Sequence, residues 1–531
     1  MWSLGHRIAP LPIPCHQRPA LGGSLLAVLL LALGLLVGCA SLPDDYSRVP
    51  SAAIENHQDT RLGQIIDPPA WAEAGESGFL LLPNGREAFT TRIALIDLAE
   101  QSIDLQYYIW QPDMTGRILG RRLLFAADRG VRIRLLIDDI QLDGRDEIAA
   151  AMAVHPNIEL RTFNPFASRT NPLMDFLLDS ERVNHRMHNK SMIVDNAVAI
   201  VGGRNIGDIY FQVADDANYR DLDIGAAGPI VREISDVFDY FWNGEWSVPI
   251  EALVDDPPGA EELAAYRETL EDWYADARET YPHPLDEDIE AQIERILARR
   301  EALVWAPGWI IWDDPATFDE DDPEGVILQG LLRKAQTLEQ ELLIESAYFV
   351  PGRAYVPRYA ELVDRGVRVR VLTNSLASND VLAAHAGHAE FREDLLDAGV
   401  EIYEMRDDAG TVKQEVLAAG SRAGLHTKAA VFDNDSIFVG SFNFDPRSGF
   451  LNTEAGVYVE SPELAAELKA FMDEGVDPSN AYHVQLDRDG ELFWVTEEDG
   501  REIRLTEEPG ATFTNQFLTD LIIALPVEDQ L

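Results

Sequence analysis

Cysteine is almost absent from this chain. Only Cys15 and Cys39 occur among 531 residues, and both lie near the N-terminus. If the first 38 residues are removed during export, Cys39 alone is left, so the mature chain has neither an intramolecular disulfide nor a cysteine-based metal site. The 46% of hydrophobic residues instead indicates a globular protein with ordinary cores.

Basic residues are also scarce. The chain has 43 Lys and Arg against 92 Asp and Glu, a formal net charge of −49. Because affinity for nucleic acid comes mainly from Lys and Arg, this balance disfavours a nucleic-acid partner. The same charge should repel an anionic membrane, although salt shortens the Debye length to about 3 Å at 1 M. This charge balance fits either a protein that works at high salt or a surface whose charge only increases solubility.

The first 38 residues contain no acidic side chain. Arg7 and Arg18 are their only formal charges, and an uncharged apolar run extends from Leu21 to Gly38. This order is typical of a signal peptide, and the segment LVGC that ends at Cys39 resembles a bacterial lipoprotein processing site. We therefore expect a signal peptide at 1–38, a lipidated Cys39 and a membrane-anchored body facing the periplasm. An uncleaved anchor is the alternative, since about 18 apolar residues just span a bilayer.

The body of the chain contains an internal repeat. Strand-like Ser102 to Trp110, a helical stretch and the segment RGVRIRLL recur as Glu341 to Val350, a second helical stretch and RGVRVRVL. Strands alternating with helices predict βαβ units and a sheet flanked by helices. We accordingly predict two similar α/β domains, at residues 80–250 and 306–475.

The remaining segments connect or extend these domains. Residues 39–79 are polar and rich in proline, which predicts a linker, and the acidic segment 251–305 predicts a helical connector. Two Asp-Gly turn signals favour a small β-meander within the C-terminal part, 476–531, which ends in an apolar tail. The apolar stretches 163–178 and 513–525 either contact lipid or dock on the body.

Each repeat carries the polar pattern H-x-K-x4-D. The candidate catalytic residues defined by this motif are His188, Lys190, Asp195, His426, Lys428 and Asp433. Seventeen residues after each histidine comes an asparagine, and the segments DLDIGAAGP and EAGVYVESP align an aspartate of the first repeat with a glutamate of the second. The predicted supporting residues are Asn205, Asn443, Ser441, Asp221 and Glu454.

The spacing within the motif separates its residues into two groups. In a strand, residues i and i+2 face the same side, so each histidine points with its lysine into one site. Asp195 and Asp433 lie seven residues after their histidines, and this odd offset puts them on the opposite face. We expect these two aspartates to be structural.

These residue types fit transfer of a phosphodiester group. One imidazole can attack phosphorus and hold a covalent phospho-enzyme, while the other protonates the leaving alkoxide and later deprotonates the acceptor. Lysines and asparagines stabilise phosphoryl oxygens. Asp221 and Glu454 are the candidates for carboxylates that fix the histidine tautomers. We expect no cofactor and no metal, because His385 and His388, spaced i, i+3, lack a third ligand.

The paired motifs resemble those of the phospholipase D superfamily, and specifically of C-type bacterial cardiolipin synthases. The resemblance extends over nearly the whole chain, and the segments that carry it are DLQYYIWQPDMTGR, RMHNKSMIVD, VGGRNIGDIYF, RDLDIGAAGP, SAYFVP, LTNSLASNDVLAAHAGHAEFR, GSFNFDPRSGFLNTE and the terminal ALPVE. It implies two phospholipase D-like domains, each a mixed sheet flanked by helices, with the active site at their pseudo-twofold interface.

The resemblance also implies an activity and its substrates. It implies transfer of a phosphatidyl group to phosphatidylglycerol through a phosphohistidine, without metal, to give cardiolipin, with phosphatidylethanolamine as a candidate donor. The expected partners are therefore phospholipids and a membrane, with no nucleic acid. A phospholipase D that releases phosphatidic acid shares every one of these residues. A nuclease of the superfamily is disfavoured by the charge, and a non-enzymatic lipid-binding lipoprotein by the two complete motifs. Either histidine can be the nucleophile, since the repeats are nearly symmetric.

Overall fold

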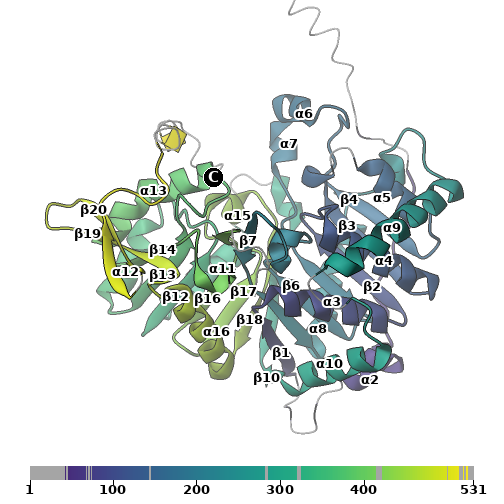
Figure 1. Cartoon of the computed structure of the whole chain (residues 1–531), viewed down its shortest axis with the longest axis horizontal. Coiled ribbons are helices and arrows are strands. Elements are labelled where there is room, and N and C mark those ends of the chain that lie inside the picture. The colour runs from purple at the N-terminus through teal and green to yellow at the C-terminus, as the bar shows by residue number, and fades with distance from the viewer. Residues whose placement is uncertain are drawn as a thin grey trace, which may run out of the picture. The chain divides into compact units, whose positions relative to one another are not determined.

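The computed structural model describes residues 46–66, 75–142, 145–281, 285–319, 325–413, 421–498 and 500–512, with residues 42, 69, 72, 518, 519, 522 and 523 in isolation. The expected signal peptide and Cys39 lie outside the described residues, as does most of the apolar tail 513–525. The description below concerns the body of the chain, in which two sheets define two lobes (Figure 1).

The first lobe is built on a nine-stranded mixed sheet. Its order is β10 (Val304–Ala306), β1 (Ser77–Leu82), β8 (Asp223–Ala227), β6 (Val198–Gly202), β5 (Ser191–Val194), β2 (Ser102–Tyr107), β3 (Arg132–Asp138), β4 (Ile158–Phe163) and β9 (Ser247–Pro249). Only the pairs β2–β3 and β3–β4 are parallel.

The second lobe repeats this order and extends it. Its ten strands run β11 (Gly308–Trp312), β18 (Ala455–Glu460), β17 (Ser436–Gly440), β16 (Lys428–Phe432), β12 (Glu341–Ser346), β13 (Arg368–Asn374), β14 (Glu401–Met405), β19 (Ala481–Leu486), β20 (Leu492–Glu498) and β21 (Arg501–Leu505). Here β12–β13 and β13–β14 are the parallel pairs. The last three strands lie in the segment predicted as a β-meander, and they continue the main sheet.

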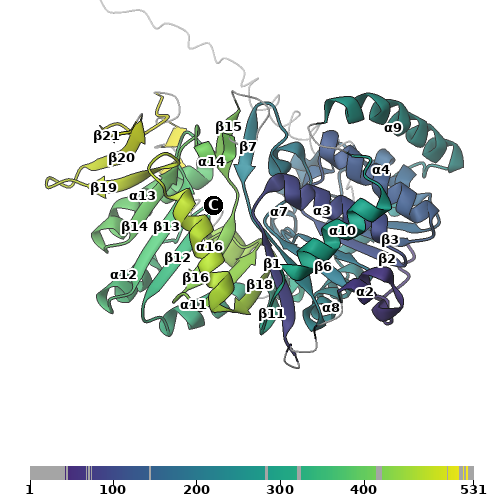
Figure 2. The same ribbon diagram turned by 60° about the horizontal axis from the view of Figure 1, so that its bottom comes forward.

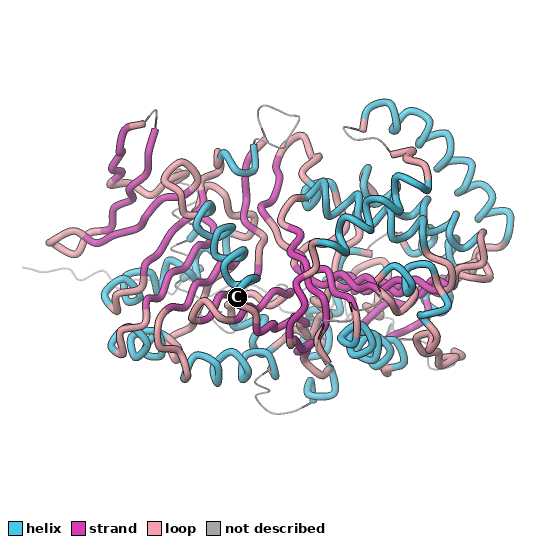
Figure 3. The backbone as a smooth tube through the Cα atoms, turned by 90° about the horizontal axis from the view of Figure 1, so that it is seen from below, coloured by secondary structure: helices cyan, strands magenta, loops and turns pink. Residues whose placement is uncertain are grey.

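Helices flank both sheets (Figure 3). Those of the first lobe are α2 (Arg61–Ile65), α3 (Gly85–Leu98), α4 (Met114–Asp128), α5 (Asp146–Ala153), α6 (Pro172–Leu178), α7 (Ser180–Asn184) and α8 (Pro229–Asn243), followed by α9 (Ala260–Thr280) and α10 (Ile289–Glu301) in the predicted connector. Those of the second lobe are α11 (Val326–Gln336), α12 (Val356–Asp364), α13 (Leu382–Asp397), α14 (Gly410–Lys413), α15 (Pro446–Phe450) and α16 (Pro462–Gly475). The short helix α2 lies within the segment predicted as a linker, and its Leu62 is fully buried.

The two RGVR segments have the same local structure. Gly130 and Gly366 adopt φ values of 96° and 88°, in the left-handed region where glycine has no steric penalty. The amide of each glycine and of the valine that follows it bonds back into the last turn of α4 or α12. This arrangement ends a helix in a Schellman motif and releases the chain directly into β3 or β13. The repeated sequence therefore encodes a helix end followed by a strand.

The lobes share one hydrophobic core. Helices α8 and α16 bury their apolar faces in a single cluster with strands of both sheets; among its members are Phe79, Val201, Phe238, Val439, Val457 and Leu464. Strand β7 (Ala217–Arg220) of the first lobe also pairs in parallel with β15 (Arg422–Leu425) of the second, and Figure 2 shows these strands side by side between the lobes. This continuous packing fixes the two H-x-K motifs relative to each other.

Candidate active site

The H-x-K segments lie where the two lobes meet. In the first copy the strand β5 starts at Ser191, just after Lys190, whereas in the second copy β16 starts at Lys428 itself. The backbone amide of His188 donates to the carbonyl of Thr453 at 2.9 Å, and that of His426 donates to the carbonyl of Arg220 at 2.8 Å. The backbone of each motif is therefore hydrogen-bonded to the opposite lobe.

Each histidine also takes its carboxylate from the opposite lobe. The Nδ1 atom of His188 lies 2.9 and 3.0 Å from the two carboxylate oxygens of Glu454. The Nδ1 atom of His426 lies 2.7 Å from Oδ2 of Asp221. A carboxylate at Nδ1 holds the proton on that nitrogen and leaves Nε2 as the free nucleophilic or basic atom.

The two carboxylates differ in their own partners. The hydroxyls of Ser441 and Ser448 both donate to Glu454, the latter at 2.8 Å. Gly203 replaces Ser441 in the first repeat, and a Cβ on Gly203 would lie 2.2 Å from Oδ1 of Asp221. A side chain at position 203 is therefore excluded by the position of Asp221.

Burial sets the protonation of these groups. It lowers the pKa of His188 well below its usual value, helped by the positive charges of Lys190 and Lys428. It also lowers the pKa of His426. The lowered pKa values favour the neutral imidazole that a nucleophile needs, whereas the histidine that acts as general acid must carry a second proton, on Nε2, when it acts.

The two carboxylates respond differently to the same burial. Burial raises the pKa of Glu454 to about 7. Burial also acts to raise the pKa of Asp221, but the charges of His426 and Arg204 outweigh it, so the net shift is downward. The repeats are therefore electrostatically unequal at the residues that hold the histidines.

The two lysines line the same site. The ammonium group of Lys190 donates to the carbonyl of His188, and that of Lys428 donates to the carbonyl of His426 at 2.7 Å. Both side chains are at most 2% exposed, and burial lowers both pKa values. Two cations in a site with little water are suited to holding phosphoryl oxygens.

Tyrosines form the walls around the histidines. The ring of Tyr108 stands edge-on to His188, with centroids 4.8 Å apart. The ring of Tyr219 stacks on His426 at 5.2 Å, and Tyr210 meets the same imidazole edge-on at 5.0 Å.

The hydroxyls of Tyr219 and Tyr348 both donate to Asp380 at 2.8 Å. Sequence reasoning did not select Tyr210, Tyr219 or Asp380, although Tyr219 lies only two residues before Asp221.

The two asparagines are used differently. The side-chain oxygen of Asn205 accepts a hydrogen bond from the amide of Ile109 at 3.1 Å. Among the described residues, the side-chain oxygen of Asn443 is buried without a partner. The backbone amide of Asn443 points to the hydroxyl of Ser448, at 3.3 Å. Asn443 thus has the greater capacity for a new contact.

The two motif aspartates follow the ends of β5 and β16, in turns with positive φ, so the strand offset used to predict their orientation does not apply to them. The carboxylate of Asp195 accepts hydrogen bonds from the amides of residues 100–102, at the start of β2. That of Asp433 accepts from the amides of residues 339–341, at the start of β12. Each aspartate ties its H-x-K strand to the neighbouring strand. Their geometry is that of structural residues.

His385 and His388 belong to a separate buried network. His385 lies 3.2 Å from Glu508, and His388 lies 3.4 Å from Glu404. The guanidinium of Arg392 bonds to both of these glutamates at 2.7 Å. Over the described ranges, no group of three or more His, Cys, Asp or Glu side chains is arranged to hold a metal ion.

A duplicated α/β lobe with paired H-x-K motifs defines a phospholipase D-type fold and site. The family model of the cardiolipin synthase, PLD-like domain matches residues 93–242 and 328–475. Cardiolipin synthase C of Escherichia coli strain K12 is 39% identical over 473 residues, which cover 88% of this chain and 99% of that protein. The chain belongs to the phospholipase D superfamily, in the cardiolipin synthase-like family, and is a phosphatidyltransferase that acts on phospholipids.

Two further comparisons found similar chains. An uncharacterized protein of Helicobacter pylori strain J99 is 31% identical over 474 residues, covering 88% of this chain and 92% of that protein. The crystal structure of phosphatidylserine synthase from Haemophilus influenzae Rd KW20 matches with a TM-score of 0.52 and 14% identity, over 84% of this chain and 91% of that one. At this identity the second match supports the fold alone.

The described helices include none that is both long enough and apolar enough to cross a bilayer.

Proposed function

We propose that this protein makes cardiolipin, by moving a phosphatidyl group onto phosphatidylglycerol through a phosphohistidine intermediate. The observation that carries the proposal is the pair of crossed contacts, His188 with Glu454 and His426 with Asp221, around two buried lysines. The similarity to a cardiolipin synthase C over 88% of the chain supports the choice of acceptor.

The chemistry has two steps, in which the histidines have complementary roles. In the first, Nε2 of one imidazole attacks phosphorus as the bond to the leaving alcohol breaks, and the other imidazole donates its Nε2 proton to that alcohol. In the second, the now neutral imidazole takes the proton of a glycerol hydroxyl of phosphatidylglycerol. That oxygen attacks phosphorus, and the P–N bond breaks.

The remaining site residues support this exchange. Lys190 and Lys428 stabilise the charge on the phosphoryl oxygens in both steps. Asp221 and Glu454 keep each Nδ1 protonated and stabilise an imidazolium when it forms. Asn443, with its free side-chain oxygen, accepts a hydrogen bond from a hydroxyl group of the substrate and so orients it. Asp195 and Asp433 act only by holding the motif strands in place.

We also propose that the body works at a membrane surface, tethered by a lipidated Cys39 and facing the periplasm. Helix α6 supports membrane contact, because its Leu173, Leu177 and Leu178 are between 65% and 71% exposed. Exposed apolar side chains this close together are uncommon on a soluble surface. With a net charge of −49, attachment to an anionic bilayer requires such apolar contacts or acyl chains.

Product analysis tests the proposed reaction. Detergent-solubilised protein is incubated with phosphatidylglycerol, with and without phosphatidylethanolamine, and the lipids are read by mass spectrometry. We expect cardiolipin, and released ethanolamine if phosphatidylethanolamine is a donor. Phosphatidic acid without cardiolipin would instead establish a phospholipase D, which uses the same site with water as acceptor. If the folded protein forms neither cardiolipin nor phosphatidic acid, the proposal is refuted.

The intermediate is tested separately. Protein quenched with denaturant at neutral pH, where the P–N bond and the acyl esters both survive, is examined by mass spectrometry for a phosphatidyl adduct, with the His188→Ala and His426→Ala variants in parallel. We expect turnover to be lost in both variants and the adduct to be absent from the one that lacks the nucleophile. Turnover that survives in either variant would contradict the two-histidine scheme.

A further inference from the structure

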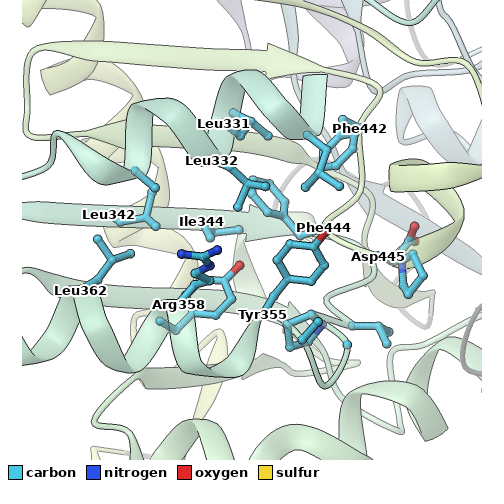
Figure 4. A pocket seen from close by; sticks show the side chains of 18 of the residues that line it. Leu331, Leu332, Leu342, Ile344, Tyr355, Arg358, Leu362, Phe442, Phe444 and Asp445 are labelled. Atoms are coloured by element: carbon cyan, nitrogen blue, oxygen red, sulfur yellow. The ribbon is translucent and has the colours of Figure 1, made fainter. Parts of the chain in front are cut away.

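The second lobe contains an apolar pocket that the mechanism above does not use. It lies between α11 and α12, above β12, and has a volume of about 360 Å³ (Figure 4). Leucines 328, 331 and 332 of α11 form one wall, and Tyr359 and Leu362 of α12 form another. A volume of this size is within the range of small-molecule sites, which are mostly apolar.

The corresponding space in the first lobe is filled. The Glu-Gln pair at 100–101 in the first repeat matches the pair at 339–340 in the second. With the repeats aligned on these pairs, Leu328 of the second lobe corresponds to Phe89 of the first, and Leu331 corresponds to Arg92. Phe89 packs against the rings of Phe211 and Tyr281, at 5.1 and 5.4 Å.

Two buried arginines occupy the rest of that space. The guanidinium of Arg92 lies 2.8 Å from the carboxylate of Asp223, and that of Arg204 lies 3.3 Å from it. Arg204 and Phe442 stand at the same distance from their motif histidines. The second lobe thus has leucine and phenylalanine where the first has an ion-paired cluster. Because the fold is the same, the pocket is a property of the second repeat and not a requirement of the architecture.

The pocket leads along the sheet toward the catalytic lysine. Strands β12 and β16 pair in the register Leu342–Phe432, Ile344–Ala430 and Ser346–Lys428. These alternate residues share one face of the sheet. Leu342, Ile344 and Phe432 line the pocket. At about 3.3 Å per residue, the pair containing Lys428 lies roughly 7 Å beyond Ile344.

The loop after the second motif closes the end of the pocket nearest the site. Phe442, Phe444 and Asp445 lie at this end in Figure 4, and they flank the candidate site residue Asn443. The amide of Phe444 points to the hydroxyl of Ser346, at 3.2 Å. The pocket and the phosphoryl-transfer site therefore share one loop.

A basic side chain lies across the pocket. The side chain of Arg358 is 65% exposed, and its ion-pair partner Glu361 is 4.0 Å away (Figure 4). Such an exposed pair is weak, so Arg358 remains available to an anionic group. A cation here is notable in a chain with 92 acidic and 43 basic residues.

From these contacts we infer that the pocket between α11 and α12 binds one acyl chain of a phospholipid substrate, with the lipid phosphate held near Lys428. The inference rests on the proposed function, because it assumes a lipid at the histidines, and it deepens that proposal by assigning a site to the tail. Burying the apolar end of an acyl chain there is favourable, because it removes methylene groups from water.

Photolabelling locates the tail without requiring turnover. The full chain is mixed with phosphatidylethanolamine vesicles containing phosphatidylglycerol that carries a diazirine near the end of one acyl chain. We expect crosslinks on peptides containing 326–336 or 356–364. Labelling confined to other segments, such as 513–525, would show that the tail lies elsewhere and overturn the inference. Because no product is required, this readout stands apart from the failure of the cardiolipin assay.

A filled pocket provides the kinetic test. Leu331→Trp places a large ring in the pocket, and Gln336→Trp, at an exposed position of the same helix, is the matched control. We expect Leu331→Trp to lower kcat/KM roughly tenfold with dioleoyl lipids, about the effect of losing two buried methylenes, and to change it less than about twofold with dihexanoyl lipids. Equal losses with both chain lengths, or no loss with either, would refute an acyl-chain site. Retained activity on the short lipids shows that the variant is folded.

Discussion

The Nδ1 atom of His188 lies 2.9 Å from Oε2 of Glu454, a residue 266 positions later in the chain and in the other lobe. His426 and Asp221 form the reciprocal contact across 205 positions. Neither lobe therefore supplies the carboxylate partner of its own motif histidine, and the site exists only where the lobes meet.

Removing either carboxylate should impair catalysis more than stability. Glu454→Gln and Asp221→Asn each remove the charge that fixes Nδ1–H and stabilises the imidazolium, so we expect kcat to fall by roughly two to four orders of magnitude. Initial rates of lipid transfer measure this effect, with circular dichroism as the check of folding. A loss below tenfold in both variants would argue against the assigned role.

The two motif aspartates should show the opposite behaviour. Replacing Asp195 or Asp433 with alanine leaves three strand-edge amides without their acceptor, which should cost roughly 1–3 kcal/mol of unfolding free energy. We expect the activity per folded molecule to change little at a temperature where the variants remain folded. Urea denaturation combined with activity assays measures both quantities. A catalytic role would appear as lost turnover without lost stability.

The pH dependence of stability follows from three buried carboxyl groups. Burial raises the pKa of Asp313, Asp445 and Glu454 to about 7. A carboxyl whose folded pKa lies above its unfolded value stabilises the protein at low pH, and this contribution is lost as the pH rises from about 4 through 7. We therefore expect these three groups to raise the Tm at pH 5.5 relative to pH 8, while buried histidines with lowered pKa values, such as His188 and His426, act in the opposite direction.

Two controls separate this effect from the net charge. Repulsion among surface charges is screened in 1 M salt, whereas the buried groups are affected much less. The Asp445→Asn variant should lower the Tm at pH 5.5 relative to its Tm at pH 8, compared with the unchanged protein, because the amide oxygen still accepts from Ser448 but no longer ionises. An unchanged slope in this variant, or a slope abolished by salt alone, would show that surface repulsion dominates.

A buried ion pair across the lobes gives a prediction on stability alone. Nε of Arg220 lies 2.9 Å from Oε1 of Glu345, both side chains are at most 5% exposed, and Arg220 also donates to the carbonyl of Phe471. Glu345→Ala leaves a buried cation with only peripheral partners, which should cost roughly 3–5 kcal/mol. The double variant with Arg220→Met should recover most of this loss in a urea titration. A double variant as unstable as the single one would show that packing, and not charge, is responsible.

Much of this arrangement is encoded locally and is therefore visible in the sequence. The glycines of the RGVR segments end helices because only glycine adopts their positive φ without strain, and the matched spacing of His188 and His426 marks the repeat. The alignment of Asp221 with Glu454 selected both carboxylates. Their exchange between lobes is a tertiary relationship and has no local signal.

The aromatic walls escaped prediction for another reason. Tyr219 stands between Asn218 and Arg220 in a polar stretch of the sequence, and only the folded chain brings it and Tyr210 against His426. The acyl pocket is similarly invisible, because Leu331 in a helix is unremarkable until it is compared with Arg92 in the other lobe.

The crossed carboxylates bear on how the two halves can change over time. Two identical single-repeat chains related by a dyad can form the same crossed contacts, because the carboxylate of each chain can bond to the histidine of the other. When both repeats lie in one chain, their residues can differ, so the two histidine–carboxylate contacts no longer have to be identical. Glu454 accepts hydrogen bonds from two seryl hydroxyls, whereas Asp221 faces a glycine that its own position requires. A change at one of these carboxylates therefore alters the histidine of the other repeat, so a substitution in either half is tolerated or not according to its counterpart.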